Sequence, residues 1–338
     1  MDARLAVFVL LDCLSMDWTK GPRPILGLSP MADFTDSPFC RLIRECGGRA
    51  VIFREMLAAE AIVRGNARTI SYLDFDAIER PLVQQLFGSN PESMAKAAEV
   101  VMQKSKPDGI DINMGCPVYK AVSNFNGASL MREPNKAAAI LSALKSTHNV
   151  PFSVKTRLGW SKPDEVIEFA QILEQAGADA LEIHARTKLQ GYSGQADWKA
   201  VKKVVDKVKI PVLVNGDIVD QKSALKALEE SGAQGLLIGR GALGNPWIFN
   251  RLEKVLAGKP DPGEPSLEDR LKGLKRHAEL QIESYGEKGL VKLRKHLPWY
   301  FKGIPGFRQF RAAAVQVASL DDLDRLIKTI IESAHQSQ

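Results

Sequence analysis

Eight short apolar runs recur along the chain up to residue 243, and they constrain the fold more than any other feature. Most are nearly continuous stretches of Val, Ile and Leu, which is typical of strands covered on both faces. Amphipathic helical patterns separate them, as between Pro163 and Gly177. The runs are Ile25–Ala32, Ala50–Met56, Pro81–Gly88, Gly109–Cys116, Pro151–Gly159, Ala180–Thr187, Pro211–Ile218 and Gly235–Leu243.

Eight β-then-α units predict a closed (β/α)8 TIM barrel of the α/β class. A doubly wound open sheet is the alternative, but no GxGxxG fingerprint follows the first run. The second unit is the weakest, because its helical segment Ala58–Tyr72 contains Gly65.

Gly258–Pro265 is predicted to be a linker, and the segments after it have helical patterns without strand-like runs. This change predicts a second part of the molecule. We expect an N-terminal extension over residues 1–21, a catalytic barrel over 22–257 and a small all-α helical bundle over 258–338. The helical patterns of this bundle are Leu267–Tyr285, Lys288–Phe301, Gly306–Ala318 and Leu320–His335.

Several classes of protein are disfavoured by simple counts. No apolar run reaches the roughly 18 residues of a membrane span, and Leu5–Leu11 lacks the cleavage site of a signal peptide. Met16 offers a second start, which leaves open whether residues 1–15 belong to the native chain. The four cysteines form no CxxC pair or Cys/His cluster, so we expect no metal and a cytoplasmic protein. We also expect a monomer, although the sequence leaves the oligomeric state open.

The net charge of +6 is concentrated in one segment. Residues 272–311 hold ten Lys/Arg against three Asp/Glu, a surplus larger than that of the whole chain. A concentrated basic surface suggests a polyanionic partner, although charge alone also fits a solvated helix face.

Polar residues gather at the carboxyl ends of the apolar runs, which share one mouth of a barrel. Lys155 and His184 lie inside apolar runs, where a charged group is costly unless it is paired or functional. Asn215-Gly-Asp and Gly239-Arg-Gly follow the last two runs, where barrels commonly hold a phosphate. A phosphate site beside a lysine and a histidine that can stabilise an electron-rich ring points to flavin mononucleotide (FMN).

A lone cysteine, Cys116, follows the fourth run in Asp111-Ile-Asn-Met-Gly-Cys-Pro117. The preceding Gly115 lets the backbone approach a ligand, and Pro117 cannot extend the ladder. A lone cysteine is more often structural, but this one precedes the long loop Pro117–Pro134 at the end where barrels place their chemistry.

Seven motifs in this order resemble the tRNA-dihydrouridine synthase family, most closely its B-type bacterial members. The resemblance extends over about residues 23–330 and includes Arg294-Lys-His-Leu-Pro-Trp-Tyr300. Ser29 replaces a common alanine, and the loop after Cys116 departs from the usual pattern. The motifs are PMADFTD at 30–36, QLFG at 85–88, DINMGCP at 111–117, KTRLGW at 155–160, HART at 184–187, NGD at 215–217 and GR at 239–240.

The resemblance implies a role for each matched residue. Cys116 is the expected proton donor, and the C-terminal helices are expected to grip tRNA. The implied FMN-binding residues are Pro30, Met31, Ala32, Gln85, Lys155, His184, Asn215, Gly216, Asp217, Gly239 and Arg240. The candidate substrate-binding residues are Asn113, Lys120, Arg186, Arg294, Lys295 and His296.

The implied reaction reduces the C5–C6 bond of specific D-loop uridines in tRNA, with FMN as cofactor and NADPH or NADH as reductant. Hydride reaches C6 from the flavin N5, and an acid must protonate C5. An ordinary cysteine thiol, with a pKa of about 8.5, is protonated at neutral pH and suits that role.

Two other functions fit parts of the sequence. An FMN barrel could reduce a free pyrimidine or a small enone, and would not need the basic helical region. A tRNA-binding protein without catalysis would keep that region but would not need the strand-end residues.

Overall fold

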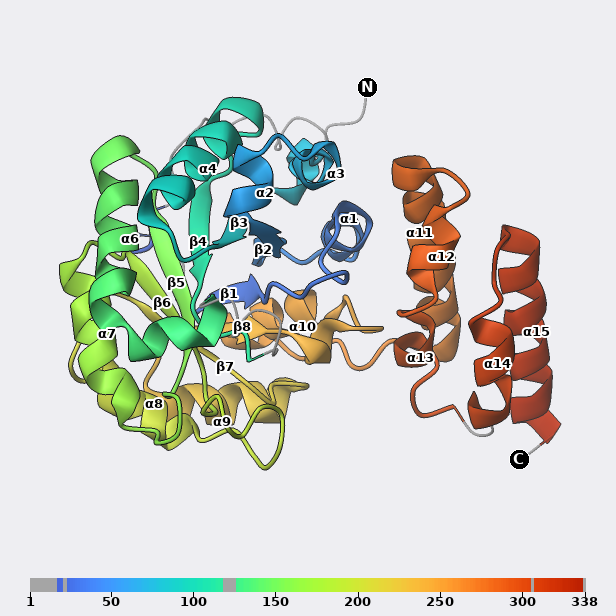
Figure 1. The fold of residues 1–338 in the computed structure, drawn as a ribbon. Helices are drawn as coiled ribbons and strands as arrows, with labels where there is room; N and C mark the ends of the chain where they lie inside the picture. Colours follow the sequence, from blue (N-terminus) through green and yellow to red (C-terminus); the bar gives the residue numbers. More distant parts are fainter. Residues whose placement is uncertain (1–16, 21–22, 118–125, 305–306, 337–338) are drawn as a thin grey trace, which may run out of the picture.

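The computed structural model describes residues 17–20, 23–117, 126–304 and 307–336, with side chains up to residue 333. Eight parallel strands close into a barrel in chain order, β1 pairing with β8, which confirms the predicted fold class (Figure 1). The strands are β1 Ile25–Leu28, β2 Val51–Ala58, β3 Leu82–Phe87, β4 Gly109–Asn113, β5 Phe152–Arg157, β6 Ala180–His184, β7 Val212–Asn215 and β8 Gly235–Ile238.

Alternation along each strand separates two packing surfaces. In β4, Ile110 and Ile112 pack with the surrounding helices, whereas Asp111 and Asn113 bond to polar side chains of neighbouring strands. At the amino end of the barrel, Trp18 packs with Phe53 and other interior side chains. The interior is therefore apolar at the bottom and polar towards the carboxyl ends of the strands.

Short helices cover the barrel, and some of them are capped as the sequence indicates. In α9, the Asp220 side chain accepts from the Ser223 N–H, and Gly232 ends the helix with φ +63°. The weak second segment splits at Gly65 into α2 and α3. The barrel helices are α1 Ser37–Glu45, α2 Ala59–Val63, α3 Ala67–Ser71, η1 Ala77–Glu79, α4 Pro91–Lys104, η2 Gly127–Arg132, α6 Pro134–Thr147, α7 Glu165–Gln175, α8 Trp198–Val205, α9 Gln221–Ser231, η3 Arg240–Ala242 and α10 Ile248–Leu256.

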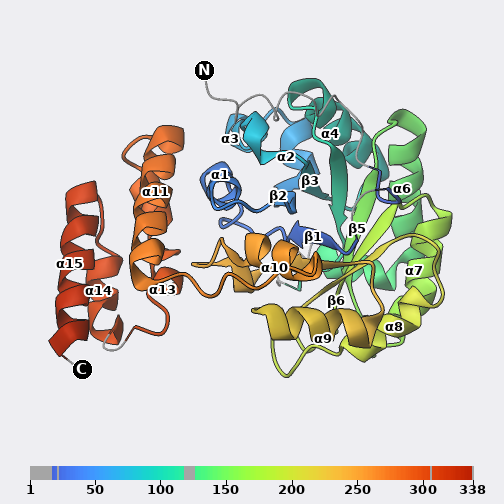
Figure 2. The same cartoon turned by 180° about the vertical axis from the view of Figure 1, so that it is seen from behind.

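The C-terminal helices stand beside α1 on one side of the barrel (Figure 1, Figure 2). The first predicted helix has the observed bounds, but the second breaks at residues 294–296, before Pro298. Pro298 has no N–H to continue the hydrogen bonds of the preceding helix but is tolerated in the first turn of a new one, which accounts for the new start at Leu297. The helices are α11 Leu267–Tyr285, α12 Gly289–Leu293, α13 Leu297–Tyr300, η4 Phe307–Phe310, α14 Arg311–Ala314 and α15 Leu320–Gln336.

Apolar and charged contacts join α1 to α11. Leu42 of α1 belongs to the same buried cluster as Leu274 of α11. Arg276 donates to Glu45 across the junction, with Nε–Oε2 at 2.8 Å. Within the described ranges, no helix has the length and apolarity that a membrane span requires.

Candidate active site

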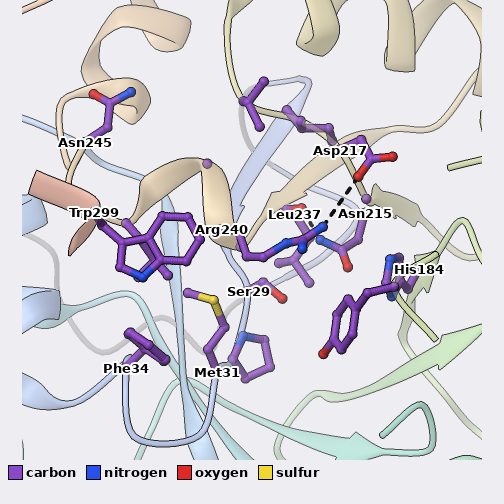
Figure 3. A pocket seen from close by; sticks show the side chains of 18 of the residues that line it. Ser29, Met31, Phe34, His184, Asn215, Asp217, Leu237, Arg240, Asn245 and Trp299 are labelled. Atoms are coloured by element: carbon purple, nitrogen blue, oxygen red, sulfur yellow. Dashed lines mark hydrogen bonds and ion pairs between the residues drawn. The ribbon is translucent and has the colours of Figure 1, made fainter. Parts of the chain in front are cut away.

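A cavity of about 950 Å³ opens at the carboxyl ends of the strands. Figure 3 shows Phe34 and Trp299 at one end of it, and His184 and Asp217 at the other. Most of the predicted site residues line this cavity: they are Pro30, Met31, Ala32, Asn113, Cys116, Lys155, His184, Asn215, Gly216, Asp217, Gly239 and Arg240.

The loop that carries Cys116 is fixed by its neighbours. The N–H groups of Gly115 and Cys116 both donate to Asn113 Oδ1, at 3.2 and 3.0 Å. Arg157 donates from Nε to the Gly115 carbonyl at 2.7 Å. Gly127, with φ +60°, passes so close that a Cβ there would lie 2.9 Å from the Cys116 carbonyl oxygen. The cysteine is half-buried on the cavity wall, as an accessible proton donor requires.

The two basic groups on the cavity wall differ in charge. Burial, with a smaller effect of Arg157, lowers the pKa of Lys155 to about 8, so its ammonium remains charged at pH 7. Burial lowers the pKa of His184 well below its usual range, and the charge of Lys155 adds to that effect. His184 is therefore neutral at pH 7. Its Nε2 lies 3.4 Å from Arg186 Nη1, which can only donate, so the ring proton belongs on Nδ1.

Asp217 organises the end of the cavity next to η3. Its carboxylate accepts from Arg186 Nη2 at 2.6 Å and lies 3.6 Å from Arg240 Nη2 (Figure 3). Burial would raise the pKa of Asp217, but the bond from Arg186 and the other donors hold it below its usual range. Arg240 keeps 51% of its side chain exposed, so it is free to meet an anion at this end.

A sequence profile described as "Dihydrouridine synthase (Dus)" matches residues 27–335. This chain belongs to the dihydrouridine synthase family. Family membership makes it an oxidoreductase of the tRNA-modifying class, which confirms the resemblance and the predicted type of activity.

Curated relatives agree over most of their length. The "Probable tRNA-dihydrouridine synthase 1" of Synechocystis sp. is 37% identical over 308 residues, covering 90% of this chain and 86% of that protein. The "tRNA-dihydrouridine synthase B" of Pseudomonas aeruginosa is 36% identical over 300 residues, covering 88% and 89%. Relatives of this dihydrouridine synthase therefore include a B-type member, as the motifs indicated.

A solved structure supports the fold alone. The complex of 2-naphthoyl-CoA reductase with 2-naphthoyl-CoA aligns with a TM-score of 0.52 at 12% identity, over 70% of this chain and 50% of that one.

Two predicted contacts of this family member need correction. Gln85, expected to touch the flavin, has no exposed surface and lies behind Asn113, outside the cavity lining. Arg186, expected to reach the uracil, is buried and bonds to Asp217 and to the Gly194 carbonyl. It supports the cavity wall from behind and has no face towards a substrate.

The predicted tRNA-contacting residues lie in different environments. Lys120 lies outside the described residues. His296 is fully buried between Phe34 and His277, so the expectation of a direct tRNA contact is wrong for it. Arg294 is half-buried and donates to the Val317 carbonyl at 2.8 Å, and Lys295 lies over the Phe34 ring. Any tRNA contact of these two residues stays a prediction.

Sequence reasoning missed several side chains on the cavity wall, among them Tyr192 and Trp299. Tyr192, 61% exposed, lies between Arg157 and Arg240, whose guanidinium carbons are 5.6 and 5.2 Å from its ring. Trp299 reaches the cavity from α13. Neither follows a strand directly, so the strand-end rule could not find them. The signal for Tyr192 was an aromatic residue between glycines, in Gly191-Tyr-Ser-Gly194.

A buried polar cluster lies at the junction of the barrel and α11. Candidate ligand atoms of Asp36, His277 and His296 lie within 4.8 Å of one another. The Gln281 Nε2 atom also lies 3.0 Å from Asp36 Oδ2 and 3.4 Å from His277 Nε2. Gln281 therefore links Asp36 to His277 across the junction, whereas the ring nitrogens of His296 have no hydrogen-bond partner among the described residues.

Proposed function

We propose that this protein is an FMN-dependent tRNA-dihydrouridine synthase that reduces D-loop uridines at the expense of NADPH, in the cytoplasm. The observation that carries the proposal is the presence of the Cys116 thiol, the Lys155 ammonium and an anion-accepting arginine on the wall of one cavity. A proton donor, a cation and a phosphate site are the groups that this reaction asks of the protein.

One end of the cavity suits the phosphate of FMN, and another part suits its ring system. Arg240 offers an exposed guanidinium next to the backbone of Gly239 and Gly241, where a phosphate would be held. A side chain at Gly241 would collide with the Ile218 carbonyl, so the chain turns tightly there. Met31 and its neighbours provide an apolar wall for a flat ring system, and a volume of about 950 Å³ leaves room for a nucleobase beside it.

The chemistry of the site follows from the protonation states of its residues. When bound, FMN reduced by NADPH supplies the hydride for C6 of the uracil. Cys116 holds the proton for C5, and its loop is kept in place by Asn113 and Arg157. Lys155 provides positive charge where negative charge accumulates. His184 is neutral and acts there as a hydrogen-bond donor.

A uridine must leave its base stack to reach this cavity, at a cost of a few kcal/mol. Phosphate contacts can offset that cost, and the exposed Lys302 stands on the cavity rim. The basic surplus is partly neutralised within the protein, since Lys272 and Arg276 form ion pairs with glutamates. The tRNA surface is therefore narrower than the charge count suggested.

The test is the formation of dihydrouridine in an unmodified tRNA transcript incubated with purified protein, FMN and either NADPH or NADH. We expect a yellow protein and dihydrouridine detectable by mass spectrometry of the digested tRNA. Cys116→Ala should keep the flavin spectrum and lose the product. Reduction of free uridine without tRNA, or a Cys116→Ala variant with wild-type turnover, would contradict the proposal.

A further inference from the structure

A layer of polar side chains lies inside the barrel directly beneath the cavity. Gln85, Asp111, Ser153 and Glu182 each have no exposed surface. They come from four neighbouring strands, β3 to β6. Buried polar groups are costly unless they are paired, so their hydrogen bonds should account for one another.

The direction of the bonds can be read from the Cys116 loop downwards. Asn113 Oδ1 accepts the N–H groups of Gly115 and Cys116, so the amide nitrogen of Asn113 points the other way. It donates to Gln85 Oε1 at 2.9 Å. The Gln85 amide nitrogen must then point onwards, and it donates to Asp111 Oδ2 at 2.5 Å. Each amide in the chain has only one orientation that fits.

Asp111 ends this chain as an acceptor on both oxygens. Oδ2 receives the bond from Gln85, and Oδ1 receives the Ser153 hydroxyl at 2.9 Å. Two accepted bonds are the pattern of an ionised carboxylate. Burial raises the pKa of Asp111 to about 6, against the effect of the Gln85 bond, so the ionised form is present at pH 7.

Glu182 has the opposite environment. Neither of its oxygens has a hydrogen-bond partner among the described residues, and its carboxyl lies beside Asp111, Ser153 and Lys155. The single hydroxyl proton of Ser153 is already donated to Asp111. Burial, and then the charge of Asp111, raises the pKa of Glu182 well above its usual range. Two adjacent buried carboxylates cannot both be ionised without a large cost. A proton on Glu182 turns the contact into a donated hydrogen bond.

We infer that Glu182 is a neutral carboxylic acid that donates to ionised Asp111, and that this pair sets the direction of the hydrogen-bond chain through Gln85 and Asn113 that positions Cys116. Gln85 and Glu182 are thus positioning residues that act on the proton donor from below. The kinetic part of this inference rests on the proposed function, whereas the protonation of Glu182 does not.

The protonation is tested by infrared spectroscopy of the purified protein at pH 8. The difference spectrum between wild type and Glu182→Gln should show the carbonyl band of a protonated carboxylic acid, present only in the wild type. A difference spectrum without that band would overturn the assignment, whether or not the protein modifies tRNA.

The positioning role is tested by the two half-reactions of the FMN-loaded enzyme. Gln85→Met should slow the oxidation of the reduced enzyme by tRNA about tenfold, and leave flavin reduction by NADPH unchanged. Gln84→Met is the matched control, because Gln84 is also buried but donates to the backbone carbonyls of Glu55 and Gln85, and not to a side chain of the chain that reaches Cys116. Equal loss in both half-reactions, or no loss, would overturn the positioning role. Absence of a tRNA reaction in the wild type would instead refute the proposed function.

Discussion

Gly244 and Trp299 bring the barrel and the C-terminal helices into backbone contact. A Cβ on Gly244 would lie 2.5 Å from the Trp299 carbonyl oxygen and 2.7 Å from the Tyr300 nitrogen. Gly244 also has φ +67°, a left-handed conformation that other residues adopt at a cost. The cavity wall formed by Trp299 therefore depends on a position where only glycine fits.

We predict that Gly244→Ala destabilises the protein beyond the conformational cost. Gly258 is the matched control, because its φ is +72° and nothing lies within 4 Å of a Cβ built there. Gly258→Ala should cost about 1–2 kcal/mol, and Gly244→Ala about 1–3 kcal/mol more for the collision. Denaturant unfolding of both variants measures the difference. Equal losses would show that the junction can relax.

Lys155 should make the site sensitive to alkaline pH. Because its pKa is lowered to about 8, its charge is lost as pH rises through that value, well below the usual lysine range. We predict that the midpoint potential of bound FMN falls more steeply above pH 8, since the reduced flavin loses a compensating cation. Lys155→Met should have a lower potential at pH 7 and no added slope. A wild type without a break near pH 8 would contradict this.

The effect of Lys155 on protein stability has the opposite sign: the free energy of unfolding rises as the pH increases. Folded Lys155 binds fewer protons than the unfolded side chain between about pH 8 and the usual lysine pKa of about 10.5. Its contribution to the free energy of unfolding therefore rises with pH across that window. Above pH 8, the midpoint potential of bound FMN should fall while the free energy of unfolding rises. This combination would distinguish the effect of Lys155 from general alkaline unfolding, in which stability falls.

The sequence predicted the barrel because the outward residues of the strands, such as Ile110 and Ile112, pack with helices and so form recognisable runs. The predicted strands extend too far at their carboxyl ends. Ser29–Ala32 and similar segments leave the hydrogen-bonded ladder of the sheet and line the cavity instead. The strand-end rule found the cavity residues without any geometry, since it depends only on where strands end.

Pairings between distant residues could not be predicted in this way. Arg186 and Asp217 are both strand-end residues, and only the structure shows that they neutralise each other. Glu182 lies in an apolar run, and nothing in its local sequence indicates that it faces Asp111. His296 belongs to a basic motif, but the break before Pro298 turns its ring into the junction. These outcomes depend on tertiary packing rather than on local pattern.

The buried imidazoles at the junction should make the protein sensitive to acid. Burial, and to a smaller extent the charge of Lys295, lowers the pKa of His277 to about 3. Burial also lowers the pKa of His296 well below its usual range. Unfolded histidines bind protons below about pH 6.5, so the stability from both rings is present above that pH and is lost as pH falls. Asp36, whose pKa is raised by burial, takes up a proton more readily in the folded protein and so opposes this loss as the pH falls.

We predict that the free energy of unfolding falls between pH 6.5 and 4.5 and that His296→Phe reduces the slope. Each histidine contributes up to about 1.4 kcal/mol per pH unit in this window. Phenylalanine keeps the ring contacts with Phe34 and Phe39. His148→Phe, at a half-buried position away from the junction, should keep the wild-type slope. An unchanged slope in His296→Phe would show that the ring does not remain neutral.

Lys302 should contact a tRNA phosphate close to the target uridine. Its side chain is exposed on the cavity rim and forms no ion pair among the described residues. We predict that Lys302→Ala weakens tRNA binding and lowers the slope of log affinity against log salt by about one unit, the value for one lost phosphate contact.

Lys272→Ala serves as the matched control for Lys302. The Lys272 side chain is equally basic and 69% exposed, but its ammonium lies 2.8 Å from Glu268 Oε1 within α11. Its removal should leave the salt slope unchanged, because an ammonium already paired with a carboxylate releases few counterions when tRNA binds. Equal effects of the two variants would mean that charge acts over the whole helical surface. A loss confined to Lys302 would place the phosphate backbone at the mouth of the barrel.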